Sequence, residues 1–169
     1  MTRGRIFTVY LTTIAAMLVA LSGAPELPIK IVYNASASAP LGWYAIEESD
    51  DVSAGDLVVV RQPLRAAALM VERGYIARDV PLVKFVMGTA GAEICRHGEH
   101  VTINARDAGD ALTRDSRERP LPRWDGCHTL TPTEIFLFNG DVRGSFDGRY
   151  FGPTPAADII GKARPLWTW

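Results

Sequence analysis

The chain has 169 residues, of which 47% are hydrophobic and 22% charged, and its formal net charge is −1. This length suits one domain with a short additional segment, and the composition is that of a folded protein. The small net charge excludes the strongly basic surface that marks nucleic-acid-binding proteins, so no nucleic-acid partner is expected.

The first predicted element is a transmembrane helix over residues 6–24, behind a cytoplasmic N-terminus of residues 1–5. Ile6 to Gly23 contains no charged residue. As a helix this stretch spans about 27 Å, just enough for a hydrocarbon core of about 30 Å. Arg3 and Arg5 precede it and favour an N-terminus on the cytoplasmic side of the inner membrane.

The remainder, residues 25–169, is predicted to be a periplasmic domain whether the N-terminal segment is retained or removed. The alternative to an anchor is a cleaved signal peptide with a small-residue site at Ala20-Leu21-Ser22. Cys95 and Cys127 are the only cysteines, and an even pair in an exported domain predicts a disulfide. Two unrelated buried thiols are the alternative reading of this pair.

The pattern after Pro28 is strand-like. Short runs rich in β-branched and aromatic residues predict strands at 29–33, 43–46 and 57–61. A short helix is predicted over 64–71, and a strand over 82–87 places Lys84 on one face with Leu82 and Val86.

The second half of the chain continues this alternation of short elements. A hairpin is predicted over 93–103, a surface loop over 104–123, and a strand over 135–138. The Asn139-Gly140 pair is a turn signal, and a helical turn at 155–160 precedes a last strand at 162–167. The predicted fold class is mainly β with short helices.

Lys84 is one of three lysines in a chain with 15 arginines. The apolar neighbours on its predicted strand disfavour a charged ammonium, and a neutral lysine can act as a general base. The alternative is a lysine on an edge strand that prevents aggregation.

Ser38 lies in a loop of small residues. The alanines that flank it leave room for a substrate backbone. On an extended segment Ser36 and Ser38 point to the same side, which allows Ser36 to donate to an oxyanion while Ser38 attacks; the Ser38 N–H is a second donor. The alternative is a serine that serves only turn geometry. His97 and His100 are three residues apart in the predicted hairpin, a spacing that is not expected to bring them together, so no metal site and no cofactor are predicted.

Three motifs follow one another along the chain. The first is Asn-x-(Ser/Thr)-x-Ser-x-Pro-x-Gly-x-Tyr from Asn34 to Tyr44. The second is Leu-Val-Lys-x-Val-x-Gly from Leu82 to Gly88, and the third is Gly-Asp…Ser-x-Asp-x-Arg-Tyr-Phe-Gly-Pro from Gly140 to Pro153. In this order they resemble the bacterial type I signal peptidase (leader peptidase) family and specifically its conjugal-transfer TraF branch. The resemblance covers most of residues 29–167.

The resemblance implies a signal-peptidase-like, β-rich catalytic domain that lies against the membrane. It implies a dyad of Ser38 as nucleophile and Lys84 as general base, with Ser36 at the oxyanion hole. In the third motif, Ser145 is expected to orient the lysine amine.

Asp147 and Arg149 of the third motif are expected to form an ion pair that holds this loop near the dyad; structural support without a part in catalysis is the alternative. Two positions depart from the family pattern. Ala92 stands where the lysine motif usually continues to an aspartate, and Gly148 stands where many relatives have serine.

The resemblance therefore implies a membrane-anchored serine endopeptidase that processes exported precursors, with pilin precursors of a conjugative type IV secretion system as expected substrates. The inner membrane and the conjugative transfer apparatus are the other expected partners. Val58, Val60 and Phe85 are expected to line a shallow apolar substrate site. The alternatives are a housekeeping type I signal peptidase and a catalytically silent, anchored assembly component of a secretion system.

Overall fold

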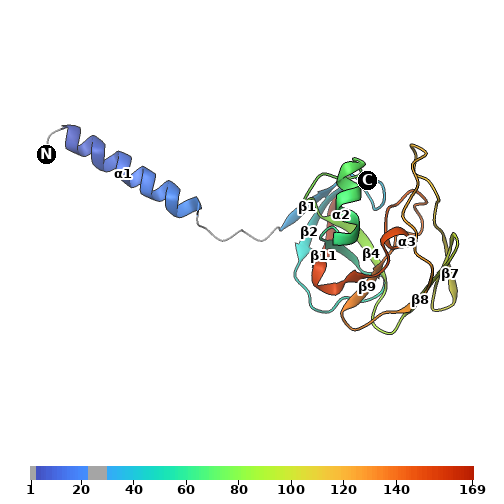
Figure 1. The fold of residues 1–169 in the computed structure, drawn as a ribbon. Coiled ribbons are helices and arrows are strands. Elements are labelled where there is room, and N and C mark those ends of the chain that lie inside the picture. Colours follow the sequence, from blue (N-terminus) through green and yellow to red (C-terminus); the bar gives the residue numbers. More distant parts are fainter. Residues whose placement is uncertain (1–2, 23–29) are drawn as a thin grey trace.

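The computed structural model describes residues 3–22 and 30–169 (Figure 1). Helix α1 spans Arg3–Ser22 and has Arg3, Gly4 and Arg5 in its first turn. In these described ranges, no helix is both long and apolar enough to cross a membrane. The prediction of a helix is confirmed, whereas the prediction of a transmembrane span over residues 6–24 is not, and residues 23 and 24 lie outside the described ranges.

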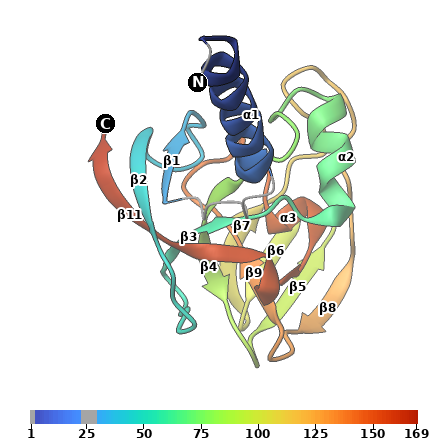
Figure 2. The same ribbon diagram turned by 90° about the vertical axis from the view of Figure 1, so that its left-hand side faces the viewer.

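The larger of two sheets has seven strands in the order β1-β2-β11-β3-β4-β9-β10, and each neighbouring pair is antiparallel. Its strands are β1 (Ile31–Asn34), β2 (Gly42–Glu47), β3 (Leu57–Val60), β4 (Leu82–Gly88), β9 (Glu134–Leu137), β10 (Thr154–Pro155) and β11 (Ile159–Thr168). The long strand β11 pairs with both β2 and β3, and Figure 2 shows it running from β3 to the C-terminus beside β2. Strand β11 thereby connects β2, which contains the end of the first motif, with β3, which pairs with the strand of the second motif.

The second sheet has four strands in the order β7-β6-β5-β8. Its strands are β5 (Glu93–His97), β6 (His100–Ile103), β7 (Arg106–Asp110) and β8 (Gly126–Thr129). The predicted hairpin over 93–103 is confirmed as β5 and β6. The prediction that 104–123 is entirely loop is wrong, because β7 pairs with β6 although it lacks an apolar alternation.

Strand β3 is buried on both faces, which explains its continuous run of β-branched residues. Val58 and Val60 belong to a core cluster under helix α2 (Leu64–Glu72), to which the helix contributes Ala66 and Met70. Val59 points into a second cluster on the other face. A third cluster lies between the two sheets and is formed by Ile94, Val101, Leu130, Phe136 and Phe138.

Two short helical segments follow β9. Helix α3 spans Gly148–Phe151 inside the third motif, and a 3-10 turn spans Ala156–Asp158 within the predicted helical turn. Residue 147 provides the cap of α3, because the Asp147 side chain accepts a hydrogen bond from the Arg149 backbone N–H. The mainly β architecture with short helices agrees with the fold class expected from the sequence.

Candidate active site

The loop between β1 and β2 carries Ser38 and is shaped by the first and last residues of its own motif, Asn34 and Tyr44. Asn34 is buried, and its Nδ2 donates to the carbonyls of Ser36 and Pro40 at 2.9 and 3.0 Å. The Asn34 Oδ1 accepts the Ser36 N–H at 3.1 Å, and the Tyr44 hydroxyl donates to the Pro40 carbonyl at 2.6 Å. The two side chains therefore hold the bend that presents Ser38.

Lys84 lies in the middle of β4 and is 4% exposed. Because β4 is flanked by β3 and β9, Lys84 is not on an edge strand, and that alternative is wrong. Its cross-strand partner is the fully buried Val58, and its neighbours on the same face, Leu82 and Val86, belong to the core cluster under α2. The strand thus places an amine within an apolar layer.

Burial lowers the pKa of Lys84 from its ordinary value of 10.5 to about 8. The Asp147 carboxylate opposes this shift, and the Arg149 guanidinium adds to it. Removing a cation from water disfavours its charged form. A lysine in this site therefore has a substantial neutral fraction at mildly alkaline pH.

The structure brings four of the predicted side chains together. The Lys84 Nζ donates to the Ser38 Oγ at 3.1 Å and to the Ser145 Oγ at 2.7 Å. The Ser36 Oγ lies 2.9 Å from the Ser38 Oγ and accepts the Ser38 N–H at 3.3 Å. The amine thus lies between two hydroxyls. The two expected oxyanion donors, the Ser36 hydroxyl and the Ser38 N–H, also lie together at this serine.

Asp147 and Arg149 form a buried ion pair beneath this group. The Arg149 Nε lies 2.9 Å from the Asp147 Oδ1, and the Arg149 Nη2 lies 2.9 Å from the Asp147 Oδ2. The same guanidinium donates to the carbonyls of Ser145 and Val142 at 3.1 and 3.0 Å. The pair therefore holds the loop that carries Ser145, and neither side chain hydrogen-bonds Ser38 or Lys84.

Ser38 lies between two hollows that share its side chain. The larger has a volume of about 1240 Å³ and is lined by apolar groups that include Phe85, Met87, Phe138 and Trp169. The smaller, of about 470 Å³, lies on the side of Lys84 and Ser145. A reacting peptide bond at Ser38 would have space on both sides.

Of the three residues that the sequence predicts at an apolar substrate site, only one lines either hollow. Phe85 lines the larger hollow. Val58 and Val60 are fully buried in the core under α2 and line neither hollow. They lie on the opposite face of the sheet from Phe85, since β3 pairs with β4 and side chains alternate along both strands.

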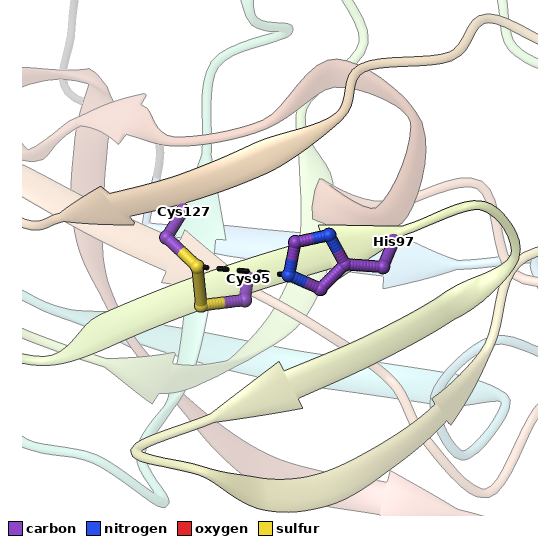
Figure 3. A group of neighbouring side chains, drawn as sticks. All are labelled: Cys95, His97 and Cys127. Carbon is purple, nitrogen blue, oxygen red and sulfur yellow. Dashed lines mark hydrogen bonds between the residues drawn. A yellow bond between two sulfur atoms is a disulfide. The ribbon is translucent and has the colours of Figure 1, made fainter.

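The structure forms the predicted disulfide, and it lies in the second sheet (Figure 3). Cys95 of β5 lies directly opposite Cys127 of β8. The His97 Nε2 is 3.9 Å from the Cys127 Sγ, so the three side chains form a compact group of potential metal ligands. Because the two sulfur atoms are bonded to each other, this group offers no thiolate pair in the disulfide state.

The prediction that His97 and His100 would not come together in the hairpin is wrong for their backbone positions. The two residues are direct partners across β5 and β6. Their side chains nevertheless have different neighbours, because the His100 Nδ1 lies 3.2 Å from the Asp110 Oδ1.

Asn139 is a site residue that sequence reasoning missed. It is 3% exposed, and its amide bridges the loop of Ser38 and the backbone of β4. The sequence showed only an Asn-Gly pair, which is typical of a turn. A polar residue directly after an apolar strand and directly before the third motif was the available signal.

A β-rich domain that places a serine hydroxyl against a buried lysine amine has the arrangement of hydrolases in which lysine replaces histidine as the base. The chain belongs to the signal peptidase family (Signal peptidase, peptidase S26), whose family model matches residues 4–169.

Several transfer proteins are similar to this chain over most of its length. The chain is 34% identical over 146 residues to a probable conjugal transfer protein TraF of Sinorhizobium fredii, which covers 80% of this chain and 76% of the relative. It is 31% identical over 179 residues to a plasmid transfer protein TraF of Escherichia coli, with 100% of both chains covered. A signal peptidase I structure from Enterococcus faecalis V583 aligns with a TM-score of 0.38 at 16% identity, over 69% of this chain and 98% of that one.

Proposed function

We propose that this protein is a serine endopeptidase in which Ser38 is the nucleophile and Lys84 the general base. The observation that carries the proposal is the 3.1 Å hydrogen bond between the Lys84 Nζ and the Ser38 Oγ. The burial that lowers the pKa of Lys84 to about 8 supports it, since only a neutral amine can accept the serine proton.

In this mechanism the Ser38 Oγ attacks the scissile carbonyl as its proton passes to the Lys84 Nζ. The Ser38 N–H and the Ser36 hydroxyl, which bond each other in the free enzyme, turn to the oxyanion of the tetrahedral intermediate. The C–N bond then breaks, and Lys84 returns the proton to the leaving amine. Lys84 next takes a proton from water, and the water oxygen attacks the acyl carbon. The ester bond then breaks, Lys84 returns the proton to the Ser38 Oγ, and the acid is released.

The Ser145 hydroxyl, 2.7 Å from the Lys84 Nζ, holds the amine in place through both steps. A lysine side chain has several rotatable bonds, and a second hydrogen bond limits the positions of its amine. The hydroxyl also accepts a hydrogen bond from the ammonium that forms during attack.

The proposed substrates are exported precursor proteins, first among them pilin precursors of a conjugative secretion system. Support comes from the relatives, which are named conjugal and plasmid transfer proteins, and from the membership of the signal peptidase family. We further propose that residues 30–169 act on the periplasmic side of the inner membrane, where the Cys95–Cys127 disulfide is stable.

The test is co-expression with candidate pilin precursors and intact-mass analysis of the pilin. Ser38→Ala and Lys84→Ala are each expected to reduce cleavage by about 10³-fold or more, by comparison with losses in other serine enzymes. Lys84→Arg is expected to be equally inactive, because arginine is not a neutral base at working pH.

Matched controls come from exposed residues of the same types. Ser53→Ala and Lys30→Arg leave the two hollows and the dyad untouched, and both are expected to cleave at the wild-type rate. Unchanged pilin processing by both Ser38→Ala and Lys84→Ala would defeat the peptidase proposal and favour an assembly component.

A further inference from the structure

The backbone of Ser38 and the backbone of β4 are joined by one buried side chain. Phe138 extends the pairing of β9 with β4, since its N–H donates to the Phe85 carbonyl at 2.9 Å. The next residue, Asn139, turns its amide toward the site. Its Oδ1 accepts the Phe85 N–H at 3.0 Å, and its Nδ2 donates to the Ser38 carbonyl.

We propose that Asn139 is a positioning residue that sets the placement of Ser38 relative to Lys84. The inference rests on the proposed function, because it assigns Asn139 a task in the same reaction. Ser38 and Lys84 are 46 residues apart and belong to separate segments. Asn139 bonds the carbonyl of the one residue and the N–H that directly follows the other, so its amide acts as a spacer between the two backbones.

A second connection runs from Asn139 to the other side of the lysine. The Asn139 N–H donates to the Asp147 Oδ2 at 3.2 Å. Asp147 pairs with Arg149, whose Nη2 donates to the Ser145 carbonyl at 3.1 Å. The Ser145 hydroxyl accepts from Lys84, which bonds Ser38. The path closes on itself, and every charged or amide group in it is buried.

Only a short primary amide fits this position. Asn139 must donate to a carbonyl and accept from an N–H at the same time, and asparagine does so with one planar group. Aspartate keeps the acceptor for the Phe85 N–H but presents an oxygen to the Ser38 carbonyl. A buried carbonyl without its donor is costly, and displacement of the nucleophile by about 1 Å costs up to about 10²-fold in rate.

The experiment is Asn139→Asp in the full-length protein, with cleavage of the pilin precursor followed from pH 6 to 9.5. We expect kcat to fall about 10- to 100-fold while KM changes less than about threefold. The new carboxylate joins Asp147 and opposes Arg149 beside the amine, so it favours the ammonium form. The acid limb of the pH profile is therefore expected to move to higher pH.

Gln62→Glu is the matched control. The Gln62 Nε2 also holds two backbone carbonyls, those of Ala77 and Val80, at 2.7 and 2.8 Å, but it lies outside both hollows. It is expected to lower the thermal unfolding temperature with no change in kcat or in the pH profile. Equal shifts in both variants would show a general loss of stability and overturn the proposal.

A second measurement needs no substrate. With only three lysines in the chain, a ¹³C-lysine NMR titration resolves Lys84, and its pKa is expected to rise in Asn139→Asp and to stay unchanged in Gln62→Glu. If Asn139→Asp does not fold, Asn139→Gln replaces it as the test variant. It keeps the amide but is one methylene longer, so it is expected to lower kcat without changing the pKa of Lys84. If the Asn139 variants keep the wild-type kcat and the wild-type pKa of Lys84, the positioning role is overturned. If the wild-type protein itself does not cleave the precursor, the proposed function is overturned instead.

Discussion

At the scale of the residue, the surroundings of Lys84 lower the pKa of its amine. Lysine is ordinarily a solvated cation, but here its strand lies inside a sheet, and its cross-strand partner is Val58 of β3. The cost of burying a charge is balanced only in part, because Asp147 favours the ammonium while Arg149 opposes it. Two serine hydroxyls supply the hydrogen bonds that an amine requires in such a site.

The pH dependence of cleavage follows from this environment. Burial lowers the pKa of Lys84 to about 8, and in the proposed mechanism the neutral amine is the active form. We expect kcat/KM to rise with pH, tenfold per unit well below pH 8, and to level off above it. The measurement is cleavage of a peptide without titratable groups between pH 6 and 9.5. A profile that is flat across this range would contradict the role of Lys84 as the base.

At the scale of elements, the packing of α3 against β9 accounts for a departure from the family pattern. A Cβ at Gly148 would lie 2.6 Å from the Phe136 ring and 2.7 Å from the Leu137 carbonyl oxygen. The helix can therefore approach β9 this closely only without a side chain at its first position. The serine that many relatives carry here would need more space than Phe136 leaves.

Gly148→Ser is accordingly expected to destabilise the protein by about 1–3 kcal/mol through overpacking. Gly144→Ser in the same loop is the control, because a Cβ there meets nothing within 4 Å, and its unfolding free energy is expected to stay near the wild-type value. Urea denaturation of both variants tests the difference. Equal stability of the two variants would show that the backbone of α3 moves away from β9 at little cost.

At the scale of the whole molecule, the disulfide lies in the second sheet and bears on the proposed periplasmic location. Cys95 and Cys127 join β5 to β8 across 32 positions of sequence. The same sheet packs on the larger one through the cluster that contains Phe136 and Phe138. The crosslinked sheet also forms part of the wall of the larger hollow, to which the β6–β7 hairpin contributes Ile103, Asn104, Arg106, Asp107 and Ala108.

In cell extracts that are denatured without a reductant, both cysteines are expected to resist an alkylating reagent, and to react with it only after reduction. The Cys95→Ser/Cys127→Ser variant is expected to lose about 3–4 kcal/mol of stability in the chain-entropy account, as measured by urea denaturation. Free thiols in the protein isolated from its host would contradict the proposed periplasmic location. Production in a reducing cytosol provides the comparison.

Local patterns sufficed for most elements of this fold. The β-branched run of β3, the apolar face of β4 and the glycine in the β5–β6 hairpin each reflect the backbone geometry of their own few residues. Strand β7 and helix α3 escaped prediction for a physical reason. The first is a polar strand that exists through its pairing with β6, and the second is a four-residue helix capped by Asp147.

The residue types alone make the chemistry available: a serine among small residues, a lysine on an apolar strand, and a third motif with a serine and an ion pair. Whether these groups meet depends on long-range strand pairing, which local patterns do not specify. Lys84 lies 46 positions from Ser38 and 61 positions from Ser145, and the pairing of β2, β11, β3, β4 and β9 into one sheet brings their segments together. The spacing role that we propose for Asn139 arises in the same way, because its two partners become neighbours only when the strands pair.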